Sequence, residues 1–392
     1  MITLDKLKIA ICYDRINKFG GAERTLLTLH EMFPNAPLYT SVLDLDNAHW
    51  AKVFPKIYTS FLQKIPFVRN NHELFGWLMP LAFETFNFSE FDLAISVTSE
   101  AAKGIITGTK TLHVCYCLTP TRYLWSGYEE YFENKILRFI SKPIVNYLRW
   151  WDKAASQRPD KIIAISTEVQ KRIKKYYVRD SEIIFPSVEQ LASYRKNRLL
   201  RVSRSSYGKT SRQFLLDMKQ YFLYVGRLVK YKKVDLIVDT FNDLGLPLVI
   251  VGIGSEEYSL KHRANDNIKF FGQVTDNELF NIYQGAKAFL MPQEEDFGIT
   301  AVEAQSFGVP VIAYNKGGAL DIVIDGKTGL LFDNQTKESL KQAIAKFDTM
   351  RFNYNYLINN AKIFSKERFK RQLQRSLVRS YNSWRRRNQT LA

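Results

Sequence analysis

The sequence predicts an α/β protein built from two doubly wound units, each with a mostly parallel sheet covered by helices. Short β-rich runs alternate with helical patterns along most of the chain, which is typical of parallel sheets with helices on both faces. The alternation stops in a polar stretch at 187–218 and then begins again. The chain has 392 residues, more than one hydrophobic core usually supports, so two domains of roughly 200 residues each are expected.

The expected strands follow the apolar runs of each half. In the first half they lie near 8–13, 92–97, 111–117 and 161–166, and in the second half at 221–228, 247–252, 267–274, 286–292 and 310–314. The stretch between the halves is rich in Ser, Arg and Lys without a clear period, as in a linker or mobile loop. We therefore expect domains at 1–200 and 201–370, followed by a basic C-terminal helix at 371–392 that packs back on the first domain.

Composition restricts the cellular setting. No apolar run approaches the length of about 18 residues that a bilayer-spanning helix needs, so no transmembrane helix is expected. The amino terminus lacks the zones of a secretory signal, which favours a cytoplasmic chain. Cys12, Cys115 and Cys117 lie in apolar strand-like runs without metal-ligand spacing, so we expect buried, reduced thiols.

The chain is strongly basic, with 56 Lys and Arg against 39 Asp and Glu and a net charge of +17. This predicts attraction to nucleotide phosphates, acidic lipids or nucleic acid. We expect no nucleic-acid partner, because the basic residues are dispersed and no nucleic-acid motif is recognised.

The stretch 133–153 has the pattern of an amphipathic, basic helix. Its predicted apolar face consists of Ile136, Ile140, Ile144, Leu148 and Trp151, and Lys135, Arg138, Lys142, Arg149 and Lys153 lie elsewhere on the helix. Pro143 is a position at which the helix would kink or divide. Two interpretations remain open: the face lies on an acidic membrane surface, at the cytoplasmic side, or it packs against the core of the first domain. The aromatic stretch 64–83 is a second candidate for either role.

The segment 292–323 carries the clearest chemical signal. It predicts a strand, a short acidic loop and a helix that begins near Phe297, Gly298 and Ile299. Backbone N–H groups at the positive end of a helix suit a diphosphate. Glu295 lies in the loop and Glu303 inside the helix, so one carboxylate can face a sugar while the other binds ribose hydroxyls. The alternative is a solvated acidic loop with a helical Glu bound to a surface partner.

A second segment, 225–238, places Arg227 and Lys232 just beyond another strand. Ligand sites in open α/β sheets collect at the carboxyl ends of strands, where these cations would meet the same diphosphate. Alone, either residue would be read as an ordinary surface cation. Gly20 and Gly21, between the first strand and the first helix, permit close approach of the backbone to a ligand, although a plain turn also explains them.

These segments resemble glycosyltransferase family 4, which has the two-domain GT-B fold with a cleft between Rossmann-like domains, over about residues 8–370. The family's Glu-x7-Glu pattern falls on Glu295 and Glu303, and its diphosphate-binding Arg and Lys fall on Arg227 and Lys232. The resemblance implies a catalytic set of Arg227, Lys232 and Glu295. It implies a donor site formed by Gly20, Gly21, Arg227, Lys232, Phe297, Gly298, Ile299 and Glu303.

The resemblance also implies the reaction. Such enzymes transfer a hexosyl group with retention, by attack of an acceptor hydroxyl on the face that the phosphate leaves, without metal or cofactor. Chains that resemble this one in the segments TSFLQK, PLAFETF and GGALDIV are mainly bacterial enzymes using GDP-mannose. Mannosyl transfer from GDP-mannose to a glycan or lipid-linked acceptor, near an acidic membrane surface, is the expected function.

Three departures affect the sugar-contact region. Leu118 replaces a family histidine, Ser126 replaces an Asp, and Ser99 stands where related chains often carry a histidine. A UDP-sugar donor, a catalytically weak or non-catalytic subunit, and an epimerase or phosphorolytic enzyme on the same fold therefore remain open. The pair Asp44 and Asp46 matches a metal-binding pattern of a different glycosyltransferase fold, and at this place in the chain we do not expect it to bind metal.

Overall fold

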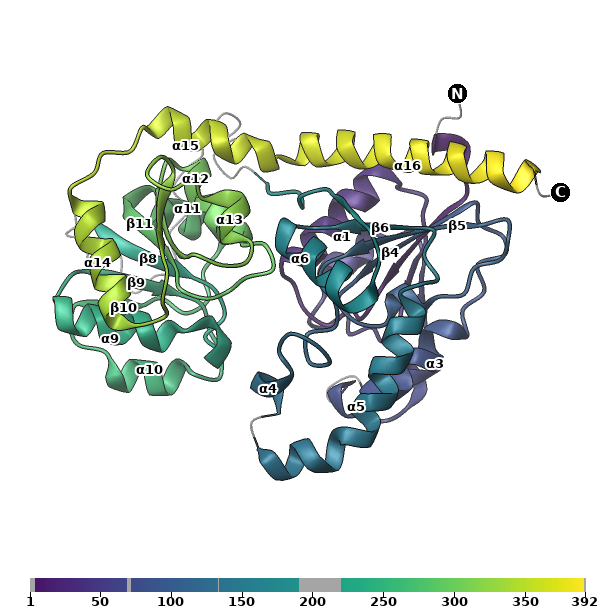
Figure 1. The fold of residues 1–392 in the computed structure, drawn as a ribbon, viewed down its shortest axis with the longest axis horizontal. Coiled ribbons are helices and arrows are strands. Elements are labelled where there is room, and N and C mark those ends of the chain that lie inside the picture. The colour runs from purple at the N-terminus through teal and green to yellow at the C-terminus, as the bar shows by residue number, and fades with distance from the viewer. Residues whose placement is uncertain (1–3, 69–71, 133, 190–219, 391–392) are drawn as a thin grey trace. The chain divides into compact units, whose positions relative to one another are not determined.

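A computed structural model describes residues 4–68, 72–132, 134–189 and 220–390 (Figure 1). The chain divides into two compact units, Met1–Ser187 with Glu367–Ala392, and Val188–Lys366. This division precedes the boundary that we expected at residue 200, and the C-terminal segment that joins the first unit begins a few residues before 371. Residues 190–218, which are most of the linker predicted at 187–218, lie outside the described residues.

The first unit is built on a parallel sheet of seven described strands in the order β3-β2-β1-β4-β5-β6-β7. The strands are β1 (Ile9–Tyr13), β2 (Leu38–Thr40), β3 (Ile57–Thr59), β4 (Leu93–Thr98), β5 (Leu112–Cys117), β6 (Lys161–Ala164) and β7 (Glu182–Ile183). All four strands predicted for this half are present. Three further strands, β2, β3 and β7, are too short to show a period in the sequence.

Helical segments surround this sheet. They are η1 (Leu4–Lys6), α1 (Gly21–Met32), η2 (His49–Val53), η3 (Phe61–Lys64), η4 (His72–Leu78), α3 (Met79–Glu84), η5 (Ala102–Gly104), α4 (Tyr128–Tyr131), α5 (Lys135–Ala155), α6 (Thr167–Arg172), the π-helical turn η6 (Ile173–Tyr177) and α16 (Lys366–Thr390). Along the first unit, Lys370 of α16 pairs with Glu31 at 2.6 Å, and Asn388 donates to the carbonyl of Thr109 at 3.0 Å. No helix of the described part of the chain is long and apolar enough to cross a bilayer.

The second unit has a parallel sheet of six described strands in the order β10-β9-β8-β11-β12-β13. The strands are β8 (Tyr221–Val225), β9 (Leu248–Val251), β10 (Ile268–Phe270), β11 (Ala286–Met291), β12 (Val311–Tyr314) and β13 (Gly329–Phe332). The helices are η8 (Lys230–Lys232), α9 (Val234–Leu244), α10 (Glu257–Arg263), α11 (Asp276–Gly285), α12 (Ile299–Ser306), α13 (Ala319–Ile322), α14 (Lys337–Asp348), α15 (Tyr354–Ala361) and η9 (Lys362–Phe364). The five strands predicted here are present, and only β13 was missed.

Local sequence explains several of these boundaries. Thr275 and Glu278 form a reciprocal capping box at the start of α11, and the Thr336 side chain accepts the N–H of Ser339 at the start of α14. Gly245 ends α9 at a φ of 64°, a conformation that favours glycine. The central strands β1, β4 and β5 are buried along their whole length, as expected of parallel strands covered on both faces. The three cysteines are buried free thiols, as predicted.

Each sheet changes its winding direction once. In the first unit the change falls between β1 and β4, and in the second between β8 and β11. Open α/β sheets bind ligands outside the carboxyl ends of their strands at this point. The fold therefore selects two places at which to look for functional side chains.

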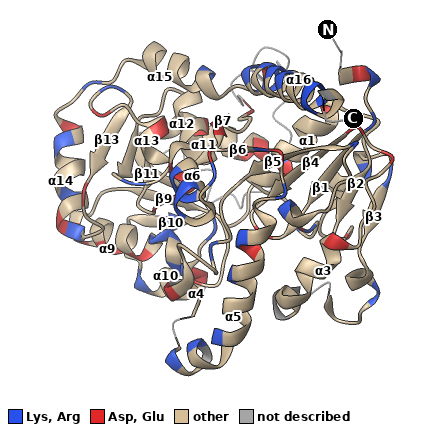
Figure 2. Ribbon diagram, turned by 45° about the vertical axis from the view of Figure 1, so that its right-hand side comes forward, with Lys and Arg blue, Asp and Glu red and all other residues tan. Residues whose placement is uncertain are grey.

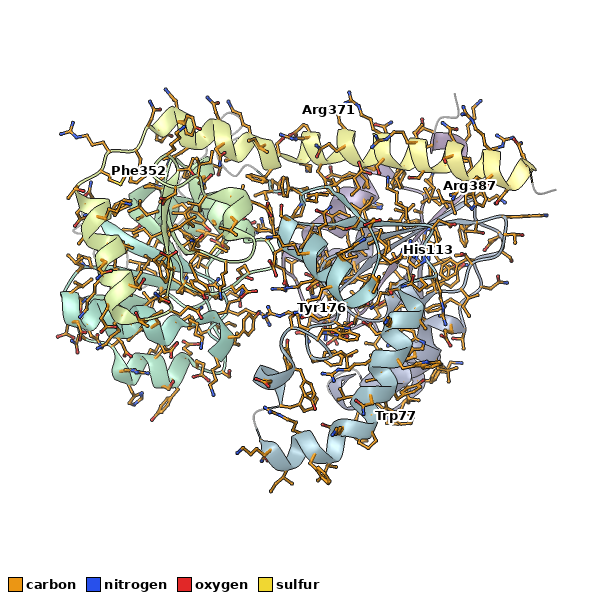
Figure 3. All side chains as sticks on the ribbon, viewed as in Figure 1. Trp77, His113, Tyr176, Phe352, Arg371 and Arg387 are labelled. Carbon is orange, nitrogen blue, oxygen red and sulfur yellow. The ribbon has the colours of Figure 1, made fainter. Side chains whose placement is uncertain are left out.

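His113 on β5 is a buried histidine in the first unit (Figure 3). Its Nε2 shares a 2.8 Å hydrogen bond with the Ser96 hydroxyl, and burial, with smaller effects of Arg158 and Arg179, lowers its pKa from 6.5 to about 3. Because the folded state holds this ring neutral, its contribution to stability is present above pH 6.5 and lost as the pH falls from 6.5 toward 3.

We expect the free energy of unfolding to fall in this window by up to about 1.4 kcal/mol per pH unit. Denaturant titrations across the window should show a smaller slope in His113→Asn, and equal slopes would contradict this account.

Candidate active site

The switch point of the second unit joins two of the residues singled out in the sequence. Lys232 lies in η8, after β8, and Glu295 lies in the loop after β11; their side chains form an ion pair and are 13% and 18% exposed. The side-chain amide of Gln293 also donates to Glu295, at 2.8 Å. Because β8 and β11 are adjacent parallel strands, the ion pair joins the loops at their carboxyl ends.

Arg227 extends this charged group (Figure 2 shows the charged residues of the chain). Its guanidinium donates to the Tyr231 hydroxyl at 2.6 Å, and the Tyr231 ring lies 5.8 Å from the guanidinium carbon and 5.1 Å from Lys232 Nζ. Tyr231 therefore contacts both cations. Sequence reasoning missed Tyr231 and Gln293, although Tyr231 is adjacent to Lys232 and Gln293 lies two residues before Glu295.

Glycines fix the backbone on both sides of the ion pair. A Cβ on Gly318 would lie 2.1 Å from the Phe297 carbonyl oxygen, and the N–H of Gly318 donates to the Glu295 carbonyl at 2.8 Å. Gly317 has a φ of 67°, and a Cβ there would lie 2.4 Å from the same Glu295 oxygen. The Gly317-Gly318 turn thus packs directly against the loop that carries Glu295, where no side chain fits.

A second glycine pair supports the backbone around Arg227. A Cβ on Gly252 would lie 1.9 Å from the Gly226 carbonyl oxygen, and one on Gly254 would lie 2.2 Å from that of Leu228. The N–H of Gly226 donates to the carbonyl of Val251, the last residue of β9, and the N–H of Leu228 donates to the carbonyl of Ile253, at 3.0 Å each. Sequence reasoning did not use these glycines, although their Gly-x-Gly spacing directly after a strand was a visible signal.

The other predicted donor residues lie on and before α12. Phe297 is buried against the Phe364 ring, with centroids 5.4 Å apart, so its side chain belongs to the core and only its backbone can reach a ligand. Gly298 is the N-cap, with a φ of 108°, and Ile299 opens the helix, where the first N–H groups have no intrahelical acceptor. Glu303 is 2% exposed and accepts a 3.1 Å hydrogen bond from the Tyr283 hydroxyl. The alternative of a solvated helical Glu with a surface partner is therefore wrong for Glu303.

The switch point of the first unit is organised around Asp14, directly after β1. Its carboxylate accepts bonds from the Thr98 hydroxyl at 2.8 Å and from the backbone N–H groups of Ser99 at 2.7 Å and Ala102 at 2.8 Å. Burial and the nearby Glu100 carboxylate raise the pKa of Asp14. Ser99, noted in the sequence as a departure, thus helps to hold this buried carboxyl group.

Gly20 and Gly21 lie in the loop between β1 and α1 of the same unit. Gly20 is the N-cap of α1 and Gly21 its first residue. A Cβ on Gly20 would lie 3.2 Å from a carboxylate oxygen of Glu23, which is buried and accepts a 2.6 Å bond from the Tyr13 hydroxyl. The loop is therefore closely packed on its own helix. Gly20 and Gly21 belong to the first unit, whereas Arg227 and Lys232 belong to the second.

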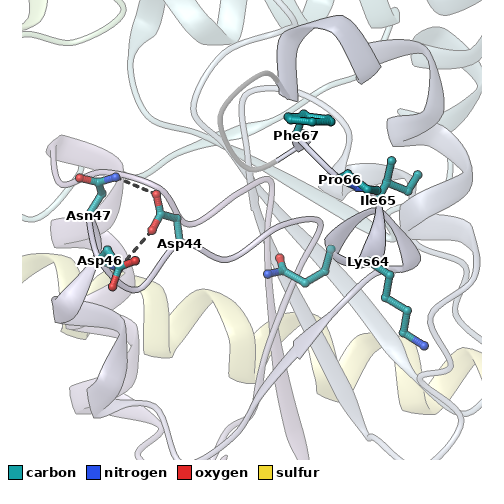
Figure 4. A pocket seen from close by; sticks show the side chains of 8 residues that line it. Asp44, Asp46, Asn47, Lys64, Ile65, Pro66 and Phe67 are labelled. Carbon is teal, nitrogen blue, oxygen red and sulfur yellow. Dashed lines mark hydrogen bonds between the residues drawn. The ribbon is translucent and has the colours of Figure 1, made fainter.

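The sequence pattern at Asp44 has a local structural role (Figure 4). One carboxylate oxygen accepts the N–H of Asp46 at 3.1 Å and the other accepts the Asn47 amide at 2.7 Å, so the side chain stabilises its own turn. Asp44, Asp46 and Asn47 line one wall of a pocket of about 470 Å³, and Phe67 lies on another. Among the described residues, no cluster of three or more His, Cys, Asp or Glu is arranged to hold a metal ion.

The family match among the comparisons with known proteins falls within the second unit. Residues 208–364 match the family described as Glycosyl transferases group 1, over less than half of the chain. An uncharacterized glycosyltransferase of Methanocaldococcus jannaschii is 28% identical over 56% of this chain and 58% of its own length. A GDP-mannose-dependent phosphatidylinositol monomannoside mannosyltransferase of Mycobacterium tuberculosis is 32% identical over 34% of this chain and 40% of its own. The chain thus spans less than two thirds of the length of these relatives.

Solved structures match over nearly the whole chain. The Anabaena protein HepE, solved in complex with UDP, superposes with a TM-score of 0.67 at 16% identity and covers 95% of this chain and 99% of its own. A glycosyltransferase from Rickettsia africae superposes with a TM-score of 0.61 at 15% identity, over 97% and 99%. At these identities the likeness concerns the fold. It confirms the predicted α/β architecture of two Rossmann-like domains, the GT-B fold.

Proposed function

We propose that this protein is a retaining glycosyltransferase that transfers a mannosyl group from GDP-mannose to a glycan or lipid-linked acceptor. The observation that carries the proposal is the group formed by Arg227, Lys232 and Glu295 at the switch point of a domain that matches group 1 glycosyl transferases. A second observation points to the same place: α12 begins at Ile299, four residues after Glu295, with Gly298 as its N-cap.

Residues of the second unit bind the donor diphosphate and stabilise it as the leaving group. Arg227 and Lys232 supply positive charge for the donor diphosphate, and the backbone N–H groups at the start of α12 supply further donors. As the bond to the sugar breaks, negative charge grows on the diphosphate, so cations already held in place lower the barrier. Tyr231 and Glu295 hold Arg227 and Lys232, respectively.

The proposed reaction needs no dedicated base. The acceptor hydroxyl attacks from the face that the diphosphate leaves, and a departing phosphate oxygen takes the hydroxyl proton. The bond from the anomeric carbon to the phosphate oxygen breaks, and a bond to the acceptor oxygen forms. Positioning and charge stabilisation carry the catalysis. We propose that metal is not required and that Glu295 faces the sugar while Glu303 binds ribose hydroxyls.

The comparisons suggest two candidates for the donor. Guanosine and mannose are suggested by the relative from Mycobacterium tuberculosis, whose name states GDP-mannose dependence. The competing candidate is a UDP-sugar, because HepE was solved with UDP and with UDP-glucose. Leu118, which replaces a family histidine, offers no hydrogen bond from its side chain to the sugar.

Calorimetric titration with GDP-mannose, GDP, UDP-glucose and UDP, each without and with EDTA, tests the proposal. We expect GDP and GDP-mannose to bind and the uridine compounds to bind at least tenfold more weakly. Tighter binding of UDP would overturn the mannosyl assignment in favour of the UDP-sugar candidate. Loss of binding on adding EDTA would overturn the metal-free mechanism. The absence of all nucleotide binding would favour a non-catalytic subunit.

The same titration tests Glu303. Glu303→Ala is expected to weaken GDP binding by roughly 10- to 100-fold, because charged hydrogen bonds to two ribose hydroxyls are lost. Glu338→Ala, an exposed glutamate on α14, is the matched control and should bind GDP normally. Since Glu303 is buried, thermal unfolding must show that the variant is folded. Unchanged affinity in a folded Glu303→Ala protein would remove its ribose assignment.

A further inference from the structure

Helix α5 of the first unit does not present one apolar face, as the sequence predicted, but two. It runs without a break from Lys135 to Ala155, through Pro143. Leu148 and Trp151 are buried, at 6% exposure each, whereas Ile136 and Ile140 are 69% and 65% exposed. Packing against the first domain is thus confirmed for Leu148 and Trp151, whereas Ile136 and Ile140 lie outside the packed face.

The buried side of α5 is held firmly. Val145, Leu148 and Trp151 pack into the first unit, and the Trp151 indole donates to the Glu84 carboxylate at 2.8 Å. Asp152 pairs with the buried Lys103 at 2.5 Å. The orientation of the helix is therefore fixed by its own domain, and the direction of its opposite side is fixed with it.

The exposed side is apolar over four turns. Residues at successive spacings of four and three form one stripe on a helix. The exposed apolar stripe consists of Ile136, Phe139, Ile140, Pro143, Ile144, Tyr147 and Trp150. Phe139 and Trp150 are 79% and 69% exposed. So many large apolar side chains on one exposed face mark an interaction surface rather than scattered surface residues.

The stripe continues onto a neighbouring segment. Trp77 of η4, itself 50% exposed, lines a groove of about 470 Å³ together with Pro143, Ile144 and Tyr147 of α5 (Figure 3 labels Trp77 beside α5). Leu81 of α3, at 51%, is also exposed. The apolar surface therefore includes residues from two separate stretches of the chain.

Positive charge borders this surface. Lys135, Lys142 and Lys153 are exposed along one edge of the stripe, and Figure 2 shows basic residues along the free end of α5. The one carboxylate within α5, Asp152, is buried and already paired with Lys103. A partner for this face must therefore be apolar where it meets the stripe and negatively charged at the edge.

We propose that the exposed face of α5, with Trp77, docks this protein on an anionic lipid bilayer. A bilayer interface satisfies both requirements, because apolar side chains enter the acyl boundary while lysines contact phosphate headgroups. Exposed Trp and Tyr side chains suit such an interface, where one part of the ring is dry and the other wet. The inference rests on α5 and not on the donor or the reaction, so it stands or fails independently of the proposed function.

Co-sedimentation of the full-length protein with vesicles tests the inference. One set contains equal amounts of phosphatidylglycerol and phosphatidylcholine, and the other contains phosphatidylcholine alone. We expect binding to the mixed vesicles, weakening as salt is added, and little binding to the neutral ones. Lys135→Glu with Lys142→Glu should reduce the partition coefficient at least about tenfold. Phe139→Ser with Ile140→Ser should do the same at low salt.

Matched controls come from the second unit and from α16. Tyr258→Ser and Lys346→Glu, both at exposed positions of the second unit, should bind like the unaltered chain. Trp150→Phe should lower the quenching of tryptophan fluorescence by brominated lipid, whereas Trp384→Phe on α16 should not. Nucleotide binding by the α5 variants is expected to remain normal, which separates this test from that of the proposed function.

Three results would overturn the inference. The first is a failure of the unaltered chain to bind anionic vesicles. The second is binding that survives the α5 variants but is lost when Arg385, Arg386 and Arg387 are replaced, which would assign the attraction to α16. The third is a dimer, detected by light scattering without lipid, that disappears in Phe139→Ser with Ile140→Ser while vesicle binding is absent, which would make a second copy of the chain the partner.

Discussion

Replacing Arg227 or Lys232 with alanine is expected to lower kcat roughly 100- to 1000-fold, the usual effect of removing one group that stabilises developing negative charge. Both cations lie at the switch point between β8 and β11, and each is already held by a neighbour, Arg227 by Tyr231 and Lys232 by Glu295. Because they are positioned in advance, their loss should fall on the chemical step more than on donor binding. Single-turnover rates with the donor that binds in calorimetry are the measurement.

Conservative variants distinguish charge from geometry at the same positions. Arg227→Lys retains the charge but loses the fork of donors that fits a phosphate, so it should recover only part of the rate. Lys261→Ala, in a surface pair with Glu257 on α10, is the control and should leave kcat unchanged. Full turnover by Arg227→Ala would remove Arg227 from the catalytic set. Equal losses in kcat/KM and in GDP affinity, at constant kcat, would reassign it to ground-state binding.

Removing Lys232 also leaves Glu295 without its cation. Glu295 keeps the hydrogen bond from the Gln293 amide, and its backbone is held by the Gly317-Gly318 turn. We therefore expect Lys232→Ala to fold and to keep the loop in place. This makes the kinetic comparison of Arg227 and Lys232 informative, since neither loss should arise from a collapsed loop.

Features that depend on neighbouring residues could be predicted from the sequence, whereas contacts between distant residues could not. Long apolar runs predicted the central strands, because each such run is a local pattern. β7 has only two residues and carries no period, and both β7 and β13 were missed. Arg227, Lys232 and Glu295 were found because they stand just after predicted strands, and parallel topology brings the ends of adjacent strands together.

Side-chain partners from distant parts of the chain could not be predicted in this way. The sequence shows that Gly252 and Gly254 follow a strand, but not that they lie against the carbonyls of Gly226 and Leu228. Likewise, helical periodicity gave α5 an apolar face but did not show which part of it the domain would cover. The covered part is set by contacts such as the ion pair between Asp152 of α5 and Lys103. These two residues are far apart in the sequence, so only the folded structure shows their contact.

The pair of Lys103 and Asp152 is the most deeply buried ion pair in the described part of the chain, with both side chains 2% exposed. Asp152 also accepts the Thr121 hydroxyl at 2.9 Å and the Trp125 indole at 2.7 Å. Burial lowers the pKa of Lys103, but the neighbouring Asp152 carboxylate outweighs it and leaves that pKa raised. The lysine is therefore charged in the folded state, and its charge is balanced by the Asp152 carboxylate of α5.

Lys103→Met is expected to destabilise the first unit by about 3–5 kcal/mol, because it leaves the Asp152 carboxylate buried without its cation. Thermal and denaturant unfolding followed by circular dichroism are the measurements. Lys174→Met provides the control: its pair with Asp180 has side chains 61% and 93% exposed, so no measurable change in stability is expected.

The double variant Lys103→Met with Asp152→Leu separates the pair from its surroundings. Removing both charges abolishes the unpaired carboxylate, so this protein should regain part of the stability lost in Lys103→Met. Recovery should be incomplete, because Thr121 and Trp125 lose their common acceptor and buried donors without partners are costly. A double variant no more stable than Lys103→Met would mean that the other contacts of Lys103 Nζ, with the Glu100 carbonyl and the Thr121 hydroxyl, outweigh its pairing with the charge of Asp152.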